Sequence, residues 1–256
     1  MRANAGTCGA TDGISPNAVA AVYYENANTT MEPKTTVTPT DAQLRDCGND
    51  DLSLTTALCS ETPDPNPATT ETIETRFGSN GTHFVWFMNN SSFRGDYNWP
   101  VLPLVKGGNV TFRNEWNVYN FGSNQTVRVV FKNFGNGPHP MHLHGHNFHV
   151  LAEGHGDWNG TIVNPSNTLQ RDVQLVRGRR NNVPGFIVLQ WKQDNPSVWP
   201  FHCHIAWHVS AGLYVNLLER PDDIRKVNFP PDSKLVCRDW WSFTGTNIIN
   251  QIDSGL

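Results

Sequence analysis

The feature that most constrains this chain is the clustering of its histidines. Eight of its ten histidines fall in two short segments, HPMHLHGHNFH at 139–149 and FHCHIAWH at 201–208. The second segment also contains one of the five cysteines, Cys203. A lone histidine is usually an ordinary core or surface residue, but this concentration of imidazoles around one thiol indicates a metal site. The fold must therefore bring the two segments together.

The spacing within the segments predicts two sites rather than one. In an extended strand, successive side chains point to opposite faces. His142 and His144 would therefore share one face of a strand. His202 and His204 would share one face of another strand, with Cys203 pointing to the opposite face. The tripeptide 202–204 can thus serve two metal centres, one on each side.

The ligand types predict copper. One thiolate with two imidazoles is the ligand set of a blue-copper site. Cys203 can supply the sulfur, and His139 and His208 can supply the nitrogens. Structural zinc is the alternative, but zinc sites usually pair their ligands as C-x-x-C or H-x-x-x-H, and the H-C-H alternation does not fit that spacing. An all-imidazole second site is expected from the remaining four histidines of the two faces, His142, His144, His202 and His204.

Composition and patterning indicate an all-β chain. Its 21 glycines and 17 prolines separate short apolar runs, none of which approaches the roughly 18 residues that cross a bilayer. With 16% charged residues and a net charge of -4, the chain offers no basic surface for nucleic acid or acidic membranes. Residues 31–75, rich in Thr, Pro, Asp and Asn, are expected to form a long exposed connection. A β-sandwich of about 150 residues is expected after it, with strands at 83–88, 109–113, 126–133, 147–154, 172–177, 185–191 and 212–219.

Sequons and cysteines favour a secreted protein. The first residues lack the apolar run of a signal peptide, so we expect an amino-terminal part of the gene product to precede this sequence. Cys203 is the candidate metal ligand, and the other four cysteines can form two disulfides with three possible connectivities. Seven N-x-S/T sequons begin at Asn28, Asn80, Asn89, Asn90, Asn109, Asn124 and Asn159.

The two histidine segments also carry a family resemblance. HPMHLHGHNFHVL and WPFHCHIAWHVSAGL are similar to the carboxy-terminal copper-binding segments of multicopper oxidases, most closely those of fungal laccases. The final DSGL resembles the processed carboxy terminus of ascomycete laccases, where it plugs a solvent channel. The resemblance implies copper as the cofactor. It assigns His139, Cys203 and His208 to the type 1 copper, His142 to the type 2 copper, and His144, His202 and His204 to the type 3 pair.

The resemblance also places residues around these ligands. Leu213 stands at the axial position of the type 1 site, where leucine leaves a three-coordinate copper and implies a higher reduction potential than methionine would. His146 and His149 have no ligand role in the family. Phe84, Trp86 and Trp207 match aromatic positions of the family's substrate pocket, although core packing is an equal alternative for Phe84 and Trp86.

The resemblance implies a domain organisation. The fold class expected is a cupredoxin-like Greek-key β-sandwich, preceded by the remnant of a second cupredoxin domain. Residues 1–75 would be the end of that second domain and a linker, residues 76–220 the third domain with the type 1 copper, and residues 221–256 a carboxy-terminal tail. The first domain, with half of the trinuclear histidines, would be absent. By resemblance Cys8 pairs with Cys47, and Cys237 reaches the absent domain; a Cys59–Cys237 bridge is the alternative.

The implied activity is that of a secreted, monomeric laccase. Such an enzyme takes single electrons from phenols or aromatic amines and couples them to the four-electron reduction of dioxygen to water. His208 would receive electrons from the substrate, and Cys203 would pass them to His202 and His204. The isolated chain is expected to be inactive. The alternative is a copper-binding or electron-transfer module without oxygen chemistry of its own.

Overall fold

A computed structural model describes residues 2–4, 17–32, 48–123 and 125–246. The chain divides into two compact units, Met1–Gly48 and Asn49–Leu256. In the first unit, β1 (Arg2–Asn4) and β2 (Asn17–Val19) form an antiparallel pair. The predicted Cys8–Cys47 disulfide and the DSGL end lie outside the described residues.

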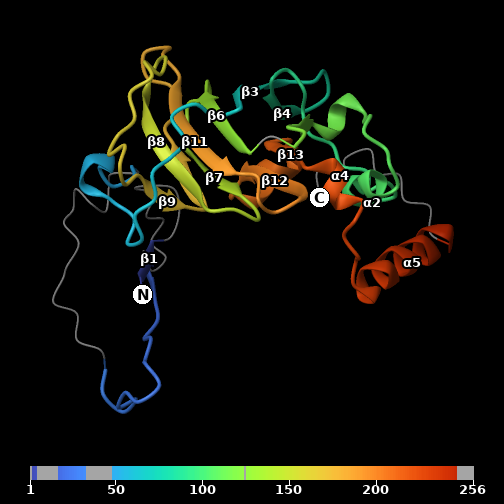
Figure 1. Cartoon of the computed structure of the whole chain (residues 1–256), viewed down its shortest axis with the longest axis horizontal. Coiled ribbons are helices and arrows are strands. Elements are labelled where there is room, and N and C mark those ends of the chain that lie inside the picture. The colour runs from blue at the N-terminus through green and yellow to red at the C-terminus, as the bar shows by residue number, and fades with distance from the viewer. Residues whose placement is uncertain (1, 5–16, 33–47, 124, 247–256) are drawn as a thin grey trace. The chain divides into compact units, whose positions relative to one another are not determined.

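The second unit contains two sheets (Figure 1). The six-stranded sheet has the order β4 (Phe84–Met88), β3 (Thr69–Ser79), β6 (Thr126–Asn133), β11 (Gly185–Lys192), β8 (Phe148–His155) and β9 (Leu169–Arg171). The five-stranded sheet has the order β10 (Val173–Val176), β7 (His139–Leu143), β12 (Ser197–Cys203), β13 (Tyr214–Glu219) and β5 (Val118–Asn120).

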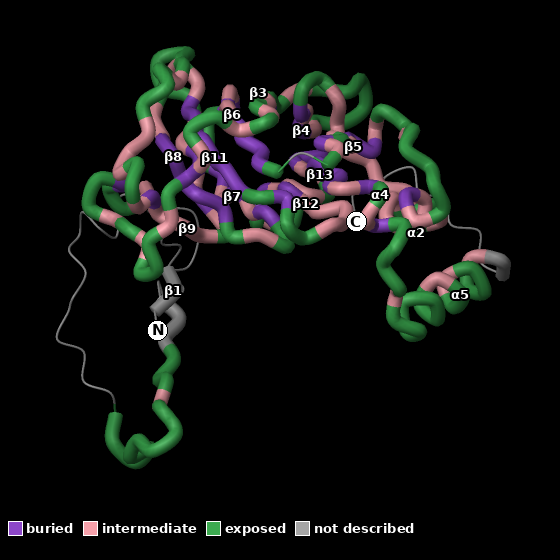
Figure 2. Tube along the Cα trace, viewed as in Figure 1, coloured by how far each residue is buried: buried purple, intermediate pink, exposed green. Residues whose placement is uncertain are grey.

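The main core lies between these sheets, where both are buried (Figure 2). Ile73, Phe131 and Leu189 come from the six-stranded sheet and belong to one buried cluster with Met141 and Phe201 of the five-stranded sheet. The rings of Phe131 and Phe201 meet edge to face with centroids 5.6 Å apart. This arrangement confirms the predicted all-β sandwich.

Short helices surround the sandwich. A second apolar cluster joins Val105 of α2 (Val101–Lys106) and Ile224 of α4 (Pro221–Ile224) to Leu218 of β13. The other helical segments are η1 (Leu52–Leu54), η2 (Asn114–Trp116), α3 (Ala206–Ser210) and α5 (Pro231–Thr246). None of the helices in the described ranges is long and apolar enough to span a membrane.

Two predictions about strands were wrong. The expected connection ends early, because residues 69–75 form the first part of β3, which pairs with β6 in parallel. The strand expected at 109–113 does not form. There the side chain of Asn109 accepts a hydrogen bond from the Thr111 N–H at 3.0 Å and turns the chain.

Candidate metal centre

Two neighbouring strands of the five-stranded sheet bring the histidine segments together. β7 and β12 are antiparallel, with His202 opposite His142 and Cys203 opposite Met141. Because side chains alternate along each strand, one face of the pair carries Cys203 and the other carries His142 and His202. The predicted division of the tripeptide 202–204 between two sites therefore rests on the strand register.

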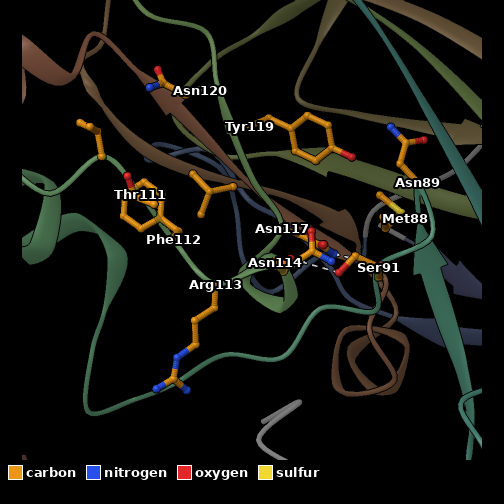
Figure 3. Close-up of a pocket in the computed structure, with 12 residues that line it drawn as sticks. Met88, Asn89, Ser91, Thr111, Phe112, Arg113, Asn114, Asn117, Tyr119 and Asn120 are labelled. Atoms are coloured by element: carbon orange, nitrogen blue, oxygen red, sulfur yellow. Dashed lines mark hydrogen bonds between the residues drawn. The ribbon is translucent and has the colours of Figure 1, made fainter.

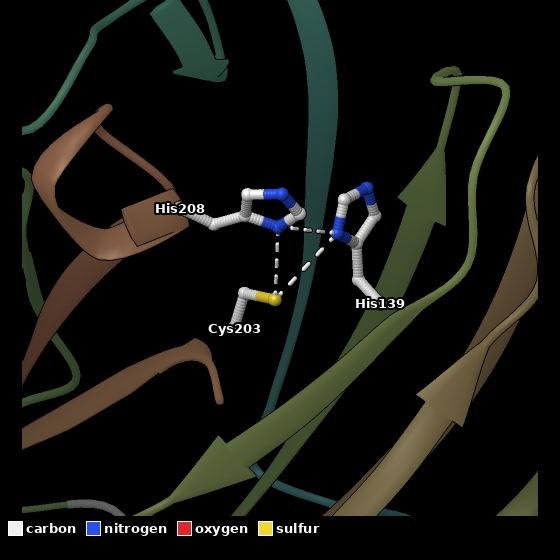
Figure 4. A group of neighbouring side chains, drawn as sticks. All are labelled: His139, Cys203 and His208. Carbon is white, nitrogen blue, oxygen red and sulfur yellow. Dashed lines mark hydrogen bonds between the residues drawn. The ribbon is translucent and has the colours of Figure 1, made fainter. Parts of the chain in front are cut away.

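The first site joins His139, Cys203 and His208 (Figure 4). The Sγ atom of Cys203 lies 3.5 Å from His139 Nδ1 and 3.4 Å from His208 Nδ1, and the two Nδ1 atoms are 3.2 Å apart. β7 carries His139, β12 carries Cys203, and the single helical turn α3 carries His208 back toward them. Within the described part of the chain, this is the only group of three His, Cys, Asp or Glu residues whose ligand atoms all lie within 4.8 Å.

Burial prepares these side chains for a metal. His139 and Cys203 are buried and His208 is partly buried. Burial, and then the neighbouring His208, lower the pKa of His139 to about 3, and burial also lowers the pKa of His208. Both imidazoles are therefore neutral at pH 7, as ligands must be. Burial raises the pKa of the Cys203 thiol to about 11, so a bound cation is needed to hold it as the thiolate.

The donor set fits copper. Atoms 3.2 to 3.5 Å apart can share one ion at bond lengths of about 2.0–2.3 Å. One sulfur with two imidazoles is the ligand set of a blue-copper centre. Leu213 is fully buried, and its carbonyl accepts a hydrogen bond from the Cys203 N–H at 3.2 Å. Leu213 and Cys203 belong to the same buried apolar cluster.

The second group of histidines lies on the other face. The ring centroid of His142 is 4.7 Å from that of His144, 5.7 Å from that of His202 and 5.4 Å from that of His204. His144 Nε2 and His202 Nε2 are 3.0 Å apart. His142 and His202 are partly buried, whereas His144 and His204 are exposed. These four rings form an open imidazole cluster that is less compact than the first site.

Backbone contacts orient two of these rings. His142 Nδ1 donates to the carbonyl oxygen of Asp172 at 2.7 Å, and His202 Nδ1 donates to the carbonyl oxygen of Cys203 at 2.8 Å. Each bond places the ring proton on Nδ1, so Nε2 is the nitrogen through which each ring could bind a metal. Burial lowers the pKa of His202 to about 4 and also lowers the pKa of His144, so both rings are neutral at pH 7.

Aromatic side chains flank the first site to different degrees. Trp86 is only 8% exposed, and its ring meets His139 edge to face at 4.4 Å. Phe84 and Trp207 are each 72% exposed. Phe77, which sequence reasoning missed, stacks on Phe84 with ring centroids 5.9 Å apart and contacts Trp86 in a tilted arrangement at 4.8 Å. Phe77 lies near the end of β3, and no sequence signal marked it because that strand was not predicted.

The remaining histidines of the segments contact other groups. His149 is buried, with Nδ1 2.7 Å from the Thr168 hydroxyl. His146 Nε2 lies 3.1 Å from Glu219 Oε2, an ion-pair distance at which the two atoms form no hydrogen bond. Glu219 is fully buried and accepts the Trp191 indole N–H at 2.7 Å. That His146 and His149 are not metal ligands stays a prediction.

Two cysteines and one pocket lie apart from the metal centre. Cys59 is exposed and Cys237 partly buried, and both are free thiols, so the alternative Cys59–Cys237 bridge does not form. A pocket of about 340 Å³ is lined by polar side chains that include Asn89, Asn114 and Asn117 (Figure 3). None of its lining residues belongs to either histidine group.

Comparison with known proteins assigns the family. The family model described as multicopper oxidase matches residues 62–223. Laccase-2 of Podospora anserina is 32% identical over 97% of this chain and 42% of its own length. Laccase-1 of Melanocarpus albomyces is 35% identical over 68% of this chain and 30% of its own length.

A solved structure supports the same family assignment. The crystal structure of laccase from Botrytis aclada matches 90% of this chain and 42% of its own chain, with a TM-score of 0.71 and 25% identity. The present chain thus spans less than half the length of the relatives it matches. The fold is accordingly the cupredoxin-like sandwich of these copper proteins. The chain belongs to the multicopper oxidase family and is related to fungal laccases.

Proposed function

We propose that the protein to which this chain belongs is a laccase, which oxidises phenols or aromatic amines by one electron and reduces dioxygen to water. The observation that carries the proposal is the two-sided arrangement of His202, Cys203 and His204. Cys203 is within 3.5 Å of two imidazole nitrogens on one face, while His202 and His204 face His142 on the other. A simple electron carrier needs only the first face.

The ligand roles follow from this arrangement. His139, Cys203 and His208 would hold a type 1 copper, His142 a type 2 copper, and His144, His202 and His204 the type 3 pair. When bound, copper supplies one-electron transfer at the first site and the four-electron reduction of dioxygen at the second. Peptide bonds join Cys203 directly to His202 and His204, so a short covalent path connects the faces. His208, partly buried beside the exposed Trp207, is the residue through which substrate electrons would enter.

Substrate contacts divide among the aromatic residues. We propose that Phe84 and Trp207, both largely exposed, contact the aromatic ring of a substrate. Trp86 is buried against His139 and serves as the wall behind that imidazole. The glycine at 135 leaves room for the Trp86 ring, because a Cβ at that position would lie 2.9 Å from the ring. In this proposal Phe84 contacts the substrate directly and Trp86 does not.

The second face is incomplete within this sequence. The resemblance gives the trinuclear cluster twice the histidines found here, and we propose that the others come from protein outside these 256 residues. The chain's coverage of 42% of the Podospora relative supports this. We propose that residues 69–220, which include the whole of β3, form the type 1 domain. Residues 1–68 would be the end of another cupredoxin domain and a linker, and residues 221–256 would be the tail.

The cellular setting is also proposed. Seven sequons and the secreted character typical of laccases support a secreted, glycosylated monomer. The net charge of -4 supports partners that are small aromatic molecules and dioxygen rather than nucleic acid or membranes.

Metal analysis, visible absorption and oxygen uptake with a phenol test the proposal. They are to be measured on the full-length gene product and on the 256-residue chain. We expect oxygen uptake from the full-length protein, and one copper with blue colour but no oxygen uptake from the chain. Oxygen uptake by the 256-residue chain alone would contradict the proposal that half of the trinuclear histidines come from outside it. Bound zinc without copper in both proteins would contradict the ligand roles.

The alternative is a copper-binding or electron-transfer module. The compact first site, with all of its ligands present in this chain, favours that function for the isolated chain. His142→Ala in the full-length protein separates the two readings. A laccase loses oxygen reduction in this variant and keeps its blue colour, whereas an electron carrier keeps both its colour and its electron-transfer rate.

A further inference from the structure

Two overlapping sequons lie in one tight turn after β4. Asn89-Asn90-Ser91 and Asn90-Ser91-Ser92 share two residues. Asn89 and Asn90 form the two-residue turn itself, with positive φ values of 46° and 70°. The turn is closed by the Met88 N–H donating to the Ser91 carbonyl at 2.8 Å and by the Ser91 N–H donating to the Met88 carbonyl at 3.1 Å. Both asparagines are exposed, so exposure alone does not distinguish the two sequons.

The side chain of Asn89 is built into the sheet. Its Oδ1 accepts from the Glu74 N–H at 2.8 Å, and its Nδ2 donates to the Thr72 carbonyl at 3.0 Å. The Asn89 backbone N–H also donates to the Glu74 carbonyl at 2.9 Å. β4 pairs with β3 only from Thr75 onward, so this amide continues the ladder along the uncovered edge of β3.

This pairing uses the hydrogen that a glycan replaces. The partners of Asn89 Oδ1 and Nδ2, the Glu74 N–H and the Thr72 carbonyl, lie on the same edge of β3 and only two residues apart. To reach both partners, Nδ2 must donate the hydrogen that lies on the same side of the amide as Oδ1. The amide is planar, and a substituent on Nδ2 stays trans to Cβ, which places it on that same side. A sugar on Asn89 would thus stand between Nδ2 and the Thr72 carbonyl and break the ladder.

Asn90 carries no such constraint. Its side chain makes no hydrogen bond to any part of the chain that the structure describes. It projects from an exposed turn position whose backbone is held by the hydrogen bonds of Met88 and Ser91. A substituent on its Nδ2 therefore leaves the turn and β3 intact.

We propose that Asn90, and not Asn89, is the residue of this turn that carries an N-linked glycan. The inference rests on the proposed secretion. In the reaction, Asn90 Nδ2 forms a bond to C1 of the sugar and loses one proton. The bond from C1 to the diphosphate of a lipid-linked oligosaccharide donor breaks, and the lipid diphosphate leaves. No oxidation or reduction is involved.

Two matched serine substitutions test the assignment in full-length protein from a secreting eukaryotic host. Ser91→Ala removes only the Asn89 sequon, and Ser92→Ala removes only the Asn90 sequon. Enzymatic release of N-glycans in heavy-oxygen water marks each glycosylated asparagine as aspartate, and mass spectrometry of the 89–92 peptide locates it. We expect the mark on Asn90 in the wild type and in Ser91→Ala, and nearly complete loss of the mark in secreted Ser92→Ala.

Two results would overturn the assignment. One is secreted Ser92→Ala with its glycan on Asn89, and the other is a wild-type peptide without a glycan on Asn90. Asn90→Gln, which also leaves only the Asn89 sequon, provides a second variant with the same expectation in case Ser92→Ala is poorly secreted. The peptide map requires neither copper nor phenol oxidation, so its outcome is independent of the laccase assignment.

Discussion

At the scale of single residues, burial keeps the proposed ligand His139 unprotonated and links the stability of the chain to pH. Its pKa falls from 6.5 to about 3 in the folded chain, mainly because it is buried. A histidine with a lowered pKa binds its proton more readily in the unfolded chain. Its contribution to stability is therefore complete above pH 6.5 and is lost as the pH falls toward 3.

This effect predicts a pH-dependent stability of the copper-free protein. Between pH 7 and 5 the loss attributable to His139 is about 2 kcal/mol, because the slope approaches about 1.4 kcal/mol per pH unit below pH 6.5. Urea unfolding at pH 7 and pH 5 measures it. His139→Phe, which cannot take up the proton, should show a pH dependence smaller by about this amount. An unchanged pH dependence in the variant would show that the lowered pKa of His139 does not contribute to it.

At the scale of elements, the connection between α3 and β13 depends on Gly212. Its φ is +100°, and a Cβ there would lie 2.1 Å from Ser92 Oγ and 2.7 Å from the Trp86 carbonyl oxygen. Gly108 has a similar φ of +96° but nothing within 4 Å of a Cβ. A comparison of substitutions at Gly212 and Gly108 therefore separates the effect of backbone strain from the effect of close packing near the proposed ligand His208.

Gly212→Ala should therefore be more harmful than Gly108→Ala. The left-handed backbone costs each variant about 1–2 kcal/mol, and overpacking adds about 1–3 kcal/mol to Gly212→Ala alone. Chemical unfolding measures the difference, and visible absorption of the copper-loaded protein should shift only in Gly212→Ala. Equal losses of stability in the two variants would show that the contact with β4 is unimportant.

The two sheets are also linked by a buried polar contact. Trp191 of β11 donates its indole N–H to Glu219 of β13 at 2.7 Å. Glu219→Gln keeps an acceptor for this N–H, whereas Glu219→Leu leaves it buried without one. We predict that the leucine variant is less stable than the glutamine variant by about 1–3 kcal/mol, measured by urea unfolding. Similar stabilities would mean that the indole finds another acceptor.

Sequence patterns predicted which histidines lie beside Cys203 better than they predicted the strands. Alternation alone separated Cys203 from His202 and His204, because strand geometry fixes which side chains share a face. The pairing of β7 with β12, which sets His202 opposite His142, is a long-range contact that no local pattern encodes. β3 was missed because its threonines and glutamates are polar on both faces. The strand expected at 109–113 was lost to the side-chain turn at Asn109.

At the scale of the whole molecule, the two faces of β12 differ in completeness. The first face has three ligand atoms within 4.8 Å, while the four rings of the second face stand open, with His144 and His204 exposed. We predict that copper binds the 256-residue chain with a stoichiometry of one at high affinity, and that further copper binds weakly. Equilibrium dialysis measures this. Several equally tight coppers would contradict the incomplete second face.

We propose above that Cys203 holds copper together with His139 and His208. Visible absorption of the copper-loaded protein tests it most directly, because an intense blue band requires the copper–thiolate bond. Cys203→Ser is compared with Cys237→Ser, which removes a thiol of α5 that is not one of the three ligand atoms. We predict that the band is present in the wild type and in Cys237→Ser and absent from Cys203→Ser. A blue band that persists in Cys203→Ser would contradict it.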